Sequence, residues 1–210
     1  EVNDDPTLDA ISDININEDA GEQTVNLTGI ATGGSEVQQL RVTATSDNTG
    51  LIPDPTVTYS SAEATGTLTF TPAADQFGTA TVTVTVEDGG LDNNLATPGD
   101  NATEVRTFTV NVAEVNDDPT LDAISDININ EDAGEQTVNL TGIATGGSEV
   151  QQLRVTAISD NTGLIPDPTV TYSSADPTGT LAFTPVADQF GTATVTVTVE
   201  DGGLDNNLAT

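Results

Sequence analysis

The chain contains nearly the same sequence twice. Residues 1–97 align with residues 114–210 at an offset of 113, and only five of the aligned pairs differ. A repeat of this length and similarity indicates a tandem array of whole domains rather than a solenoid of short units. An enzyme seldom needs two near-identical active sites in one chain, whereas stalks, spacers and multivalent binders are built from copies. The repeat therefore argues against catalysis.

The repeat also sets the expected domain boundaries. We predict one domain over residues 1–113 and a second over residues 114–210. The second copy has no counterpart of residues 98–113, so we expect it to lack its last strand, and we expect the sequence to be a window on a longer array. The five differing pairs fall at outward-facing strand positions or in turns: Thr45/Ile158, Glu63/Asp176, Ala64/Pro177, Thr69/Ala182 and Ala73/Val186.

The charge balance excludes several classes of partner. The chain has 34 Asp and Glu against three Arg, with no Lys and no His, and its net charge is −31. This sign repels nucleic acid and anionic membranes and attracts cations. Without Cys or His the chain lacks thiolate metal ligands and the usual general base. No segment has the ~18–20 apolar residues of a membrane helix, so we expect no nucleic-acid binding, no membrane insertion and no enzymatic activity.

A strict two-residue alternation identifies the strands. Residues 79–86 alternate Thr with Ala or Val, which is typical of a strand with one buried face. The further expected strands are residues 8–11 with 14–16, 25–30, 40–44, 56–59, 67–70 and 108–112. No apolar stripe with helical spacing is present. The pattern predicts an all-β fold of tandem seven-stranded immunoglobulin-like β-sandwiches.

Alternating strand directions decide which acidic loops share an end of a domain. Loops 17–22, 47–55 and 72–77 follow the first, third and fifth strands, so they lie at the pole where the chain leaves the domain. The exit pole of the first copy and the following connector carry Glu18, Asp19, Asp75 and Asn116–Asp118, and the entry pole of the second copy carries Glu200 and Asp201. We therefore expect three sources of carboxylates to converge on the junction.

Such a convergence calls for a cation. Two carboxylates ~4 Å apart repel by about 1 kcal/mol in water and by more when partly desolvated, and no basic residue is near these acids in the sequence. Ca²⁺ takes 6–8 oxygen ligands and tolerates irregular geometry, whereas Mg²⁺ demands a tighter octahedron. The residues thus favour Ca²⁺, with Mg²⁺ second.

Four short motifs resemble those of cadherin repeats. The connector Glu114–Pro119 resembles the Asn-Asp-x-x-Pro linker, and residues 16–19 resemble the acidic motif of the first loop. Asp75-Gln76 stands where the acidic pair before the sixth strand is found, and residues 86–89 resemble the end of that strand. The whole repeat is similar to the bacterial cadherin-like, immunoglobulin-like repeats of giant secreted adhesins and surface filaments.

This resemblance implies Ca²⁺ between successive domains of an extracellular or cell-surface protein. The implied ligands are Glu18, Asp75, Asn116, Asp117 and Asp118 from one side and Asp201 from the other. The equivalent positions of the other copy are Asn3, Asp4, Asp5, Asp88, Glu131 and Asp188. Residues 145–149 (Thr-Gly-Gly-Ser-Glu) replace an Asp-x-Asp motif of the family, and Gln76 replaces an acid, so we expect one or two ions at a junction instead of three.

The leading hypothesis is a structural repeat of an adhesin stalk or filament, made rigid by Ca²⁺ at its acidic junctions. Its expected partners are neighbouring repeats of the same chain, with lateral or head-to-tail self-association between copies. One alternative is a module whose pole loops bind a glycan or a protein. Another is a polymerising subunit whose second copy is completed by a neighbour's strand. A glycosidase is disfavoured because the chain has no Trp to stack on a sugar ring.

Overall fold

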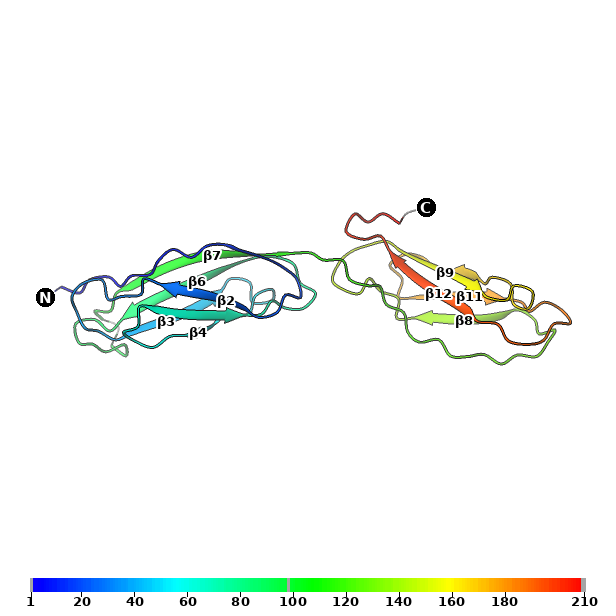
Figure 1. Ribbon diagram of the computed structural model, residues 1–210, viewed down its shortest axis with the longest axis horizontal. Helices are drawn as coiled ribbons and strands as arrows, with labels where there is room; N and C mark the ends of the chain where they lie inside the picture. The colour runs from blue at the N-terminus through cyan, green and yellow to red at the C-terminus, as the bar shows by residue number, and fades with distance from the viewer. Residues whose placement is uncertain (1, 98, 209–210) are drawn as a thin grey trace. The chain divides into compact units, whose positions relative to one another are not determined.

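The protein is all-β and consists of two compact units. A computed structural model describes residues 2–97 and 99–208, which form twelve strands and no helix, and hence no helix that could cross a bilayer. Unit 1 comprises the described residues up to Val115, and unit 2 those from Asn116 onward. The strands of each unit lie in two sheets (Figure 1). The predicted all-β sandwich fold is confirmed.

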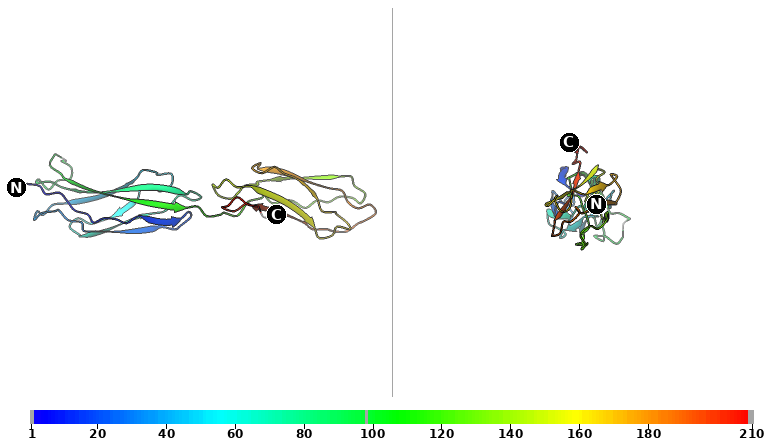
Figure 2. Two further views of the ribbon diagram at one scale, coloured as in Figure 1. Left: turned by 90° about the horizontal axis from the view of Figure 1, so that it is seen from above. Right: turned by 90° about the vertical axis from the view of Figure 1, so that its right-hand side faces the viewer.

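Unit 1 is a complete seven-stranded sandwich. One sheet has the order β1 (Ile14–Asn17), β7 (Thr103–Ala113), β6 (Gly78–Asp88), β3 (Leu40–Ser46), and the other the order β2 (Gln23–Thr28), β5 (Thr65–Phe70), β4 (Thr56–Thr58). β1 runs parallel to β7, and every other neighbouring pair is antiparallel. β7 extends along unit 1 in both the first view and the view from above (Figures 1 and 2).

Seven strands were expected in the first copy and seven are found, with one difference at the start. Residues 8–11 do not form a strand, and this part of the chain pairs only through a bridge between Thr7 and Ala31. Leu8 is nevertheless buried, so its side chain belongs to the core although its backbone is irregular. The strand directions alternate along the chain as the pole assignment requires.

The core of unit 1 is aliphatic and follows from the alternation in β6. Ala80, Val82, Val84 and Val86 are buried, whereas the intervening Thr side chains face outward and are partly exposed. Leu27 and Leu68 of the second sheet and Phe108 and Val110 of β7 complete this core. Burial of one such side chain contributes about 1.5–3 kcal/mol, so many aliphatic contributions, together with Phe70 and Phe108, make up the core of a chain that has no Trp.

The outer face carries cross-strand ion pairs. Arg41 lies opposite Glu87 and pairs with it, and Arg154 pairs with Glu200 in the same way in unit 2. The pKa of Glu87 lies below its ordinary value. The main cause is a hydrogen bond from the Asn101 amide, and the interaction with Arg41 adds to it, whereas burial acts in the opposite direction.

Unit 2 repeats this fold only in part. It contains β8 (Gln136–Thr141), β9 (Leu153–Ser159), β10 (Thr169–Thr171), β11 (Thr178–Phe183) and β12 (Val195–Asp201). β10, β11 and β8 form one sheet, and β12 and β9 form the other. Among its described residues there is no counterpart of β7, as expected, and none of β1, which was not expected. The reason is that β1 pairs only with β7 in unit 1, so residues 127–130 have no strand to pair with.

The positions that differ between the copies avoid the core. Ile158, which replaces Thr45, is 62% exposed on the outer face of β9, and neither Ala182 nor Val186 is buried. The four positions in and around the turn after the fourth strand, 63, 64, 176 and 177, are all exposed. The expected conservation of the core and variation of the surface are confirmed.

The core assignment predicts the effect of two neighbouring substitutions. Leu68→Ala is expected to lower the free energy of unfolding of unit 1 by about 2–5 kcal/mol, because Leu68 is fully buried and its truncation leaves a cavity. Thr69→Ala, which introduces the residue that stands at position 182, is the matched control and should change stability by less than about 1 kcal/mol. Urea denaturation followed by circular dichroism measures both, and equal effects would contradict the packing described.

Candidate metal centre

The entry pole of unit 1 is organised by an Asn side chain. We use entry pole for the end of a unit where its first residues meet the loops 31–39 and 89–102, or 144–152 and 202–208 in unit 2. Asn3 Nδ2 donates to both carboxylate oxygens of Asp88 at 3.2 Å and to the Asp100 carbonyl at 3.1 Å. Gln38 Nε2 donates to Asn3 Oδ1 at 2.5 Å. These bonds hold three separate segments together.

Asp88 is a structural carboxylate at the centre of this pole. It is fully buried, and its Oδ1 accepts hydrogen bonds from the backbone N–H groups of Gly90 (2.8 Å) and Ala102 (2.9 Å). These donors, together with Asn3, stabilise the buried charge. In unit 2 Asp201 Oδ1 accepts from Gly203 N (2.8 Å) and Asn116 Nδ2 (3.3 Å). Asp88 and Asp201 thus fix the loop after the sixth strand.

Two carboxylates face each other beside this network in unit 1. Asp4 Oδ2 and Glu36 Oε2 both lie over the backbone of Gly34. A Cβ atom at this position would be only 2.2 Å from each oxygen, so the two oxygens lie close together in space that is open only because residue 34 is glycine. The loop reaches this position because Gly33 adopts a φ of +93°, which favours glycine. The pKa of Asp4 is raised above its ordinary value. The main cause is repulsion from the Glu36 carboxylate, and the second is a hydrogen bond to Glu36 that only a protonated carboxyl can make.

Unit 2 contains the same pair. A Cβ on Gly147 would overlap Asp117 Oδ2 and Glu149 Oε2, and Gly146 has a φ of +103°. Asp117 N donates to Glu149 Oε1 at 2.8 Å, which orients the glutamate. Glu149 is only 5% exposed, and its Oε2 accepts no hydrogen bond within the described part of the chain. The pair is therefore a reproducible property of the repeat.

A buried amide oxygen lies at the same pole as each pair. Gln38 and Gln151 are both 8% exposed, and in the described residues the Oε1 atom of each has no hydrogen-bond donor. Their Nε2 groups are held by Asn3 and Asn116, at 2.5 and 2.7 Å. Two carboxylates and an amide carbonyl are the oxygen ligands that Ca²⁺ and Mg²⁺ use. The donor set at both entry poles fits a hard divalent cation.

Glu36, Glu149, Gln38 and Gln151 were missed by the sequence analysis. Residues 145–149 lack the Asp-x-Asp motif of the resembling family, but Glu149 supplies a carboxylate at the same pole. The signal available in the sequence was the pair of glycines two residues before the glutamate in both copies. This signal was not decisive, because the position of the glutamate depends on the positive φ of Gly33 and Gly146, which turns the loop back toward the connector.

The exit pole of unit 1 brings other predicted residues together. Asp75 N donates to Asp19 Oδ1 at 3.0 Å, which joins the two acidic loops that strand direction assigns to this pole. Glu18 is buried, and its Oε1 accepts from Val115 N at 2.6 Å. This bond fixes Glu18 to the backbone that follows β7.

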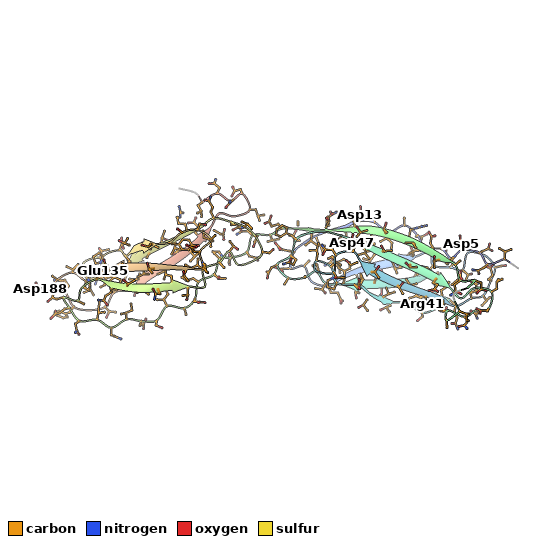
Figure 3. The ribbon with its side chains drawn as sticks, turned by 180° about the vertical axis from the view of Figure 1, so that it is seen from behind. Asp5, Asp13, Arg41, Asp47, Glu135 and Asp188 are labelled. Carbon is orange, nitrogen blue, oxygen red and sulfur yellow. The ribbon has the colours of Figure 1, made fainter. Side chains whose placement is uncertain are left out.

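The exit pole of unit 2 keeps only part of this arrangement. Asp188 N donates to Asp132 Oδ1 at 2.9 Å, as in unit 1, and Asp188 lies at one end of the unit (Figure 3). Glu131 is exposed because no backbone equivalent to Val115 is present among the described residues to hold it. Asp5 and Asp118 also have exposed side chains, and their backbone carbonyls, not their carboxylates, abut Gly33 and Gly146.

Comparisons with known proteins assign the chain to no family. No family model matches the chain, and no curated protein matches it. Among solved structures, domains 4 and 5 of the S-layer protein SbsC are 20% identical over 52% of this chain, with a TM-score of 0.32, and the chain spans 54% of that structure. The human desmocollin-1 ectodomain is 13% identical over 97% of this chain and 35% of that chain, with a TM-score of 0.39. Tandem Ig repeats of Dlar are 12% identical over 93% of this chain and 89% of that chain, with a TM-score of 0.30. Scores this low assign neither a family nor a function.

The carboxylate pair predicts a pH effect in metal-free protein. Asp4 has a raised pKa in the folded chain, so the folded state binds this proton more tightly than the unfolded state, and stability increases as the pH falls through the raised pKa toward the ordinary pKa of an Asp carboxyl. Glu36→Gln should lower the pKa of Asp4 because it removes the repulsion. Carboxyl-carbon NMR titration of Asp4 checks this result, and Glu63→Gln, an exposed acid outside the pole, is the control. An Asp4 pKa that does not respond to Glu36→Gln would contradict the pairing.

Proposed function

We propose that the chain is a structural repeat of an extracellular adhesin stalk or surface filament whose acidic poles bind Ca²⁺. The observation that carries this proposal is the carboxylate pair that recurs at both entry poles, Asp4 with Glu36 and Asp117 with Glu149. Both copies place these oxygens together although the net charge of −31 makes such an arrangement costly. A divalent cation converts this repulsion into attraction.

Each residue has a defined part in this proposal. Asp117 and Glu149 would provide the charged ligands at the entry pole of unit 2, and Gln151 Oε1 a neutral one. Asn116 and Asp201 would hold the loop that carries them, which they already do through a hydrogen bond of 3.3 Å. Glu18, Asp75 and Asp118 would add ligands at the connector, as the resemblance to cadherin repeats implies.

Calcium would act by neutralising charge and by ordering the chain. An ion that binds the folded state and not the unfolded chain stabilises the fold by about 2.7 kcal/mol when it is present at 100 times its dissociation constant. Because Asn116–Asp118 follow unit 1 directly in the sequence, an ion bound to them would also restrict the connector. Bound Ca²⁺ would turn a flexible tandem array into a stiff one, which suits a stalk.

A calcium titration tests this proposal. EGTA-stripped protein is titrated with Ca²⁺ while the melting temperature and the small-angle X-ray scattering profile are recorded. We expect the melting temperature to rise and the maximum dimension to increase. Glu149→Gln removes one charged ligand and should weaken Ca²⁺ binding by about tenfold or more.

Glu135→Gln is the matched control, because Glu135 is an exposed acid of unit 2 that directly precedes β8 (Figure 3). This variant should bind Ca²⁺ like the unmodified chain. An unchanged melting temperature and scattering profile in the unmodified protein would refute the calcium-dependent role. An equal loss of Ca²⁺ affinity in Glu149→Gln and Glu135→Gln would show that Ca²⁺ binding depends on the overall charge of the chain and not on the carboxylate pair.

A further inference from the structure

The third strand of unit 1 lies at the edge of its sheet. The strand order is β1-β7-β6-β3, so β3 is hydrogen-bonded to β6 on one side and to no strand of the described residues on the other. With seven residues β3 is the longest edge strand of unit 1, since β1, β2 and β4 have four, six and three. Arg41 and Asp47 lie near its two ends (Figure 3). An exposed edge of this length is a template on which another strand can pair.

A hydrogen bond at the end of β3 shows which backbone groups face the free edge. Asp47 N donates to Thr81 O at 3.1 Å, so the odd-numbered residues of β3 direct their N–H and C=O groups toward β6. In an antiparallel pair the intervening residues direct these groups the other way. Four residues of β3 therefore have their N–H groups on the free edge: Leu40, Val42, Ala44 and Ser46.

Side chains from the loops around β4 cap the first and the last of these four groups. Leu40 N donates to Ser61 Oγ at 2.9 Å, and Ser46 N donates to Asp54 Oδ1 at 2.8 Å. The two middle N–H groups lie between these caps. The edge that a second strand could use is thus shortened from both ends.

Unit 2 caps its third strand in the same way. Leu153 N donates to Ser174 Oγ at 2.9 Å, and Ser159 N donates to Asp167 Oδ1 at 2.8 Å. These bonds form in a unit whose described residues contain no counterpart of β7. The caps are therefore a property of the repeat itself and do not depend on how complete the sandwich is.

The aspartate cap is held in a stiff segment. Asp54 stands between Pro53 and Pro55, and Asp167 stands between two prolines in the same way. The proline rings fix the backbone φ on both sides of the aspartate, and a proline has no N–H group to offer to an incoming strand. The loop that carries the cap is therefore itself a poor partner for a sheet.

The serine cap is held by a strained turn. Glu63 N donates to Ser60 O at 3.1 Å, and Ala62, which follows Ser61 inside this turn, has a φ of +79°. A positive φ is uncommon for a residue other than glycine. The equivalent Ala175 has a φ of +76°, so both copies keep the conformation that holds the serine hydroxyl over the start of the third strand.

The sequence of β3 would otherwise suit pairing with copies of itself. Leu40–Ser46 has no Pro or Gly, and its one charged residue, Arg41, pairs with Glu87. Six- or seven-residue segments of high β-propensity and low net charge readily stack as strands. The two copies carry nearly the same edge, and misassembly between neighbours is a characteristic failure of repeat proteins. This chain therefore has a particular need to block the edge.

We propose that Ser61 and Asp54 in unit 1, and Ser174 and Asp167 in unit 2, are edge caps that prevent β-sheet addition between copies of the repeat. An incoming strand would find two of the four outward N–H groups of β3 already bonded, and strands in proteins usually have at least three residues. Covering loops, charged side chains and prolines are the usual means by which sheet edges are protected. The caps lie outside the carboxylate pairs, so this proposal is independent of calcium.

Removal of all four caps from the full chain tests the proposal. We expect the dimerisation constant, measured by analytical ultracentrifugation, to rise by about tenfold or more, because each edge gains two donors for hydrogen bonds between molecules. The variant is Asp54→Ala/Ser61→Ala/Asp167→Ala/Ser174→Ala.

Amide hydrogen exchange measured by NMR locates the contact. As the protein concentration rises, exchange in this variant should slow at the two middle positions of each edge, Val42 and Ala44 or Val155 and Ala157. A folded variant that stays monomeric would overturn the proposal, and so would association that protects amides elsewhere.

The matched control is Asp54→Asn/Asp167→Asn. It removes the same two negative charges but leaves a side-chain oxygen that can accept the hydrogen bond from the strand. This control should stay monomeric like the unmodified chain. Association as strong as that of the variant without caps would show that lower charge drives it, and the proposal would be overturned.

A second variant covers the case in which the loss of four caps unfolds the protein, which circular dichroism detects. Asp54→Ala/Asp167→Ala removes one exposed hydrogen bond from each unit and leaves the serine caps in place. It should keep its strands and dimerise more strongly than the Asn control. Equal dimerisation constants for these two variants would overturn the proposal.

Discussion

The pairing of β7 with both β1 and β6 is the interaction on which the rest of the sandwich depends. It extends the first sheet to four strands and places Phe108, Val110 and Val112 in a mainly aliphatic core. The two copies provide a natural comparison, because unit 2 has nearly the same sequence without this strand. Among the described residues of unit 2 there is no counterpart of β1, β12 is shorter than the equivalent β6, and apolar side chains line an open groove. The presence of β7 thus determines whether β1 forms and how long β6 is, because backbone N–H and C=O groups that have no partner strand do not form a sheet.

The entry poles are held together by hydrogen bonds between polar side chains, whereas the core is held together by apolar packing. Each entry pole is held by side-chain hydrogen bonds, in which Asn3 or Asn116 joins a Gln to an Asp. The carboxylate pair stands beside this network, on glycines that leave no space for a side chain. The network fixes the loops and the pair carries the uncompensated charge. This division explains how Asp88 is stable when fully buried, while Asp4 and Glu36 repel each other and raise the pKa of Asp4.

The strands and poles could be predicted from the sequence because they depend on local patterns. The Thr and Val alternation of β6 identifies its buried face, and alternating directions place Asp19 and Asp75 at one pole, where they share a hydrogen bond. Two features could not be predicted in this way. The loss of the first strand in unit 2 depends on a parallel partner that lies 96 residues away in unit 1. The contribution of Glu36 and Glu149 depends on the positive φ of a glycine, which turns the loop back toward the connector.

The central claim is that the recurring carboxylate pair is a cation site. A crystal structure with Ca²⁺ replaced by Tb³⁺, a strong anomalous scatterer that also binds oxygen ligands, tests this claim directly. The account predicts anomalous peaks bonded to Asp4 and Glu36 and to Asp117 and Glu149, with oxygen distances of about 2.3–2.6 Å. Absence of a peak at both pairs, with each pair still in contact through a shared proton, would contradict it.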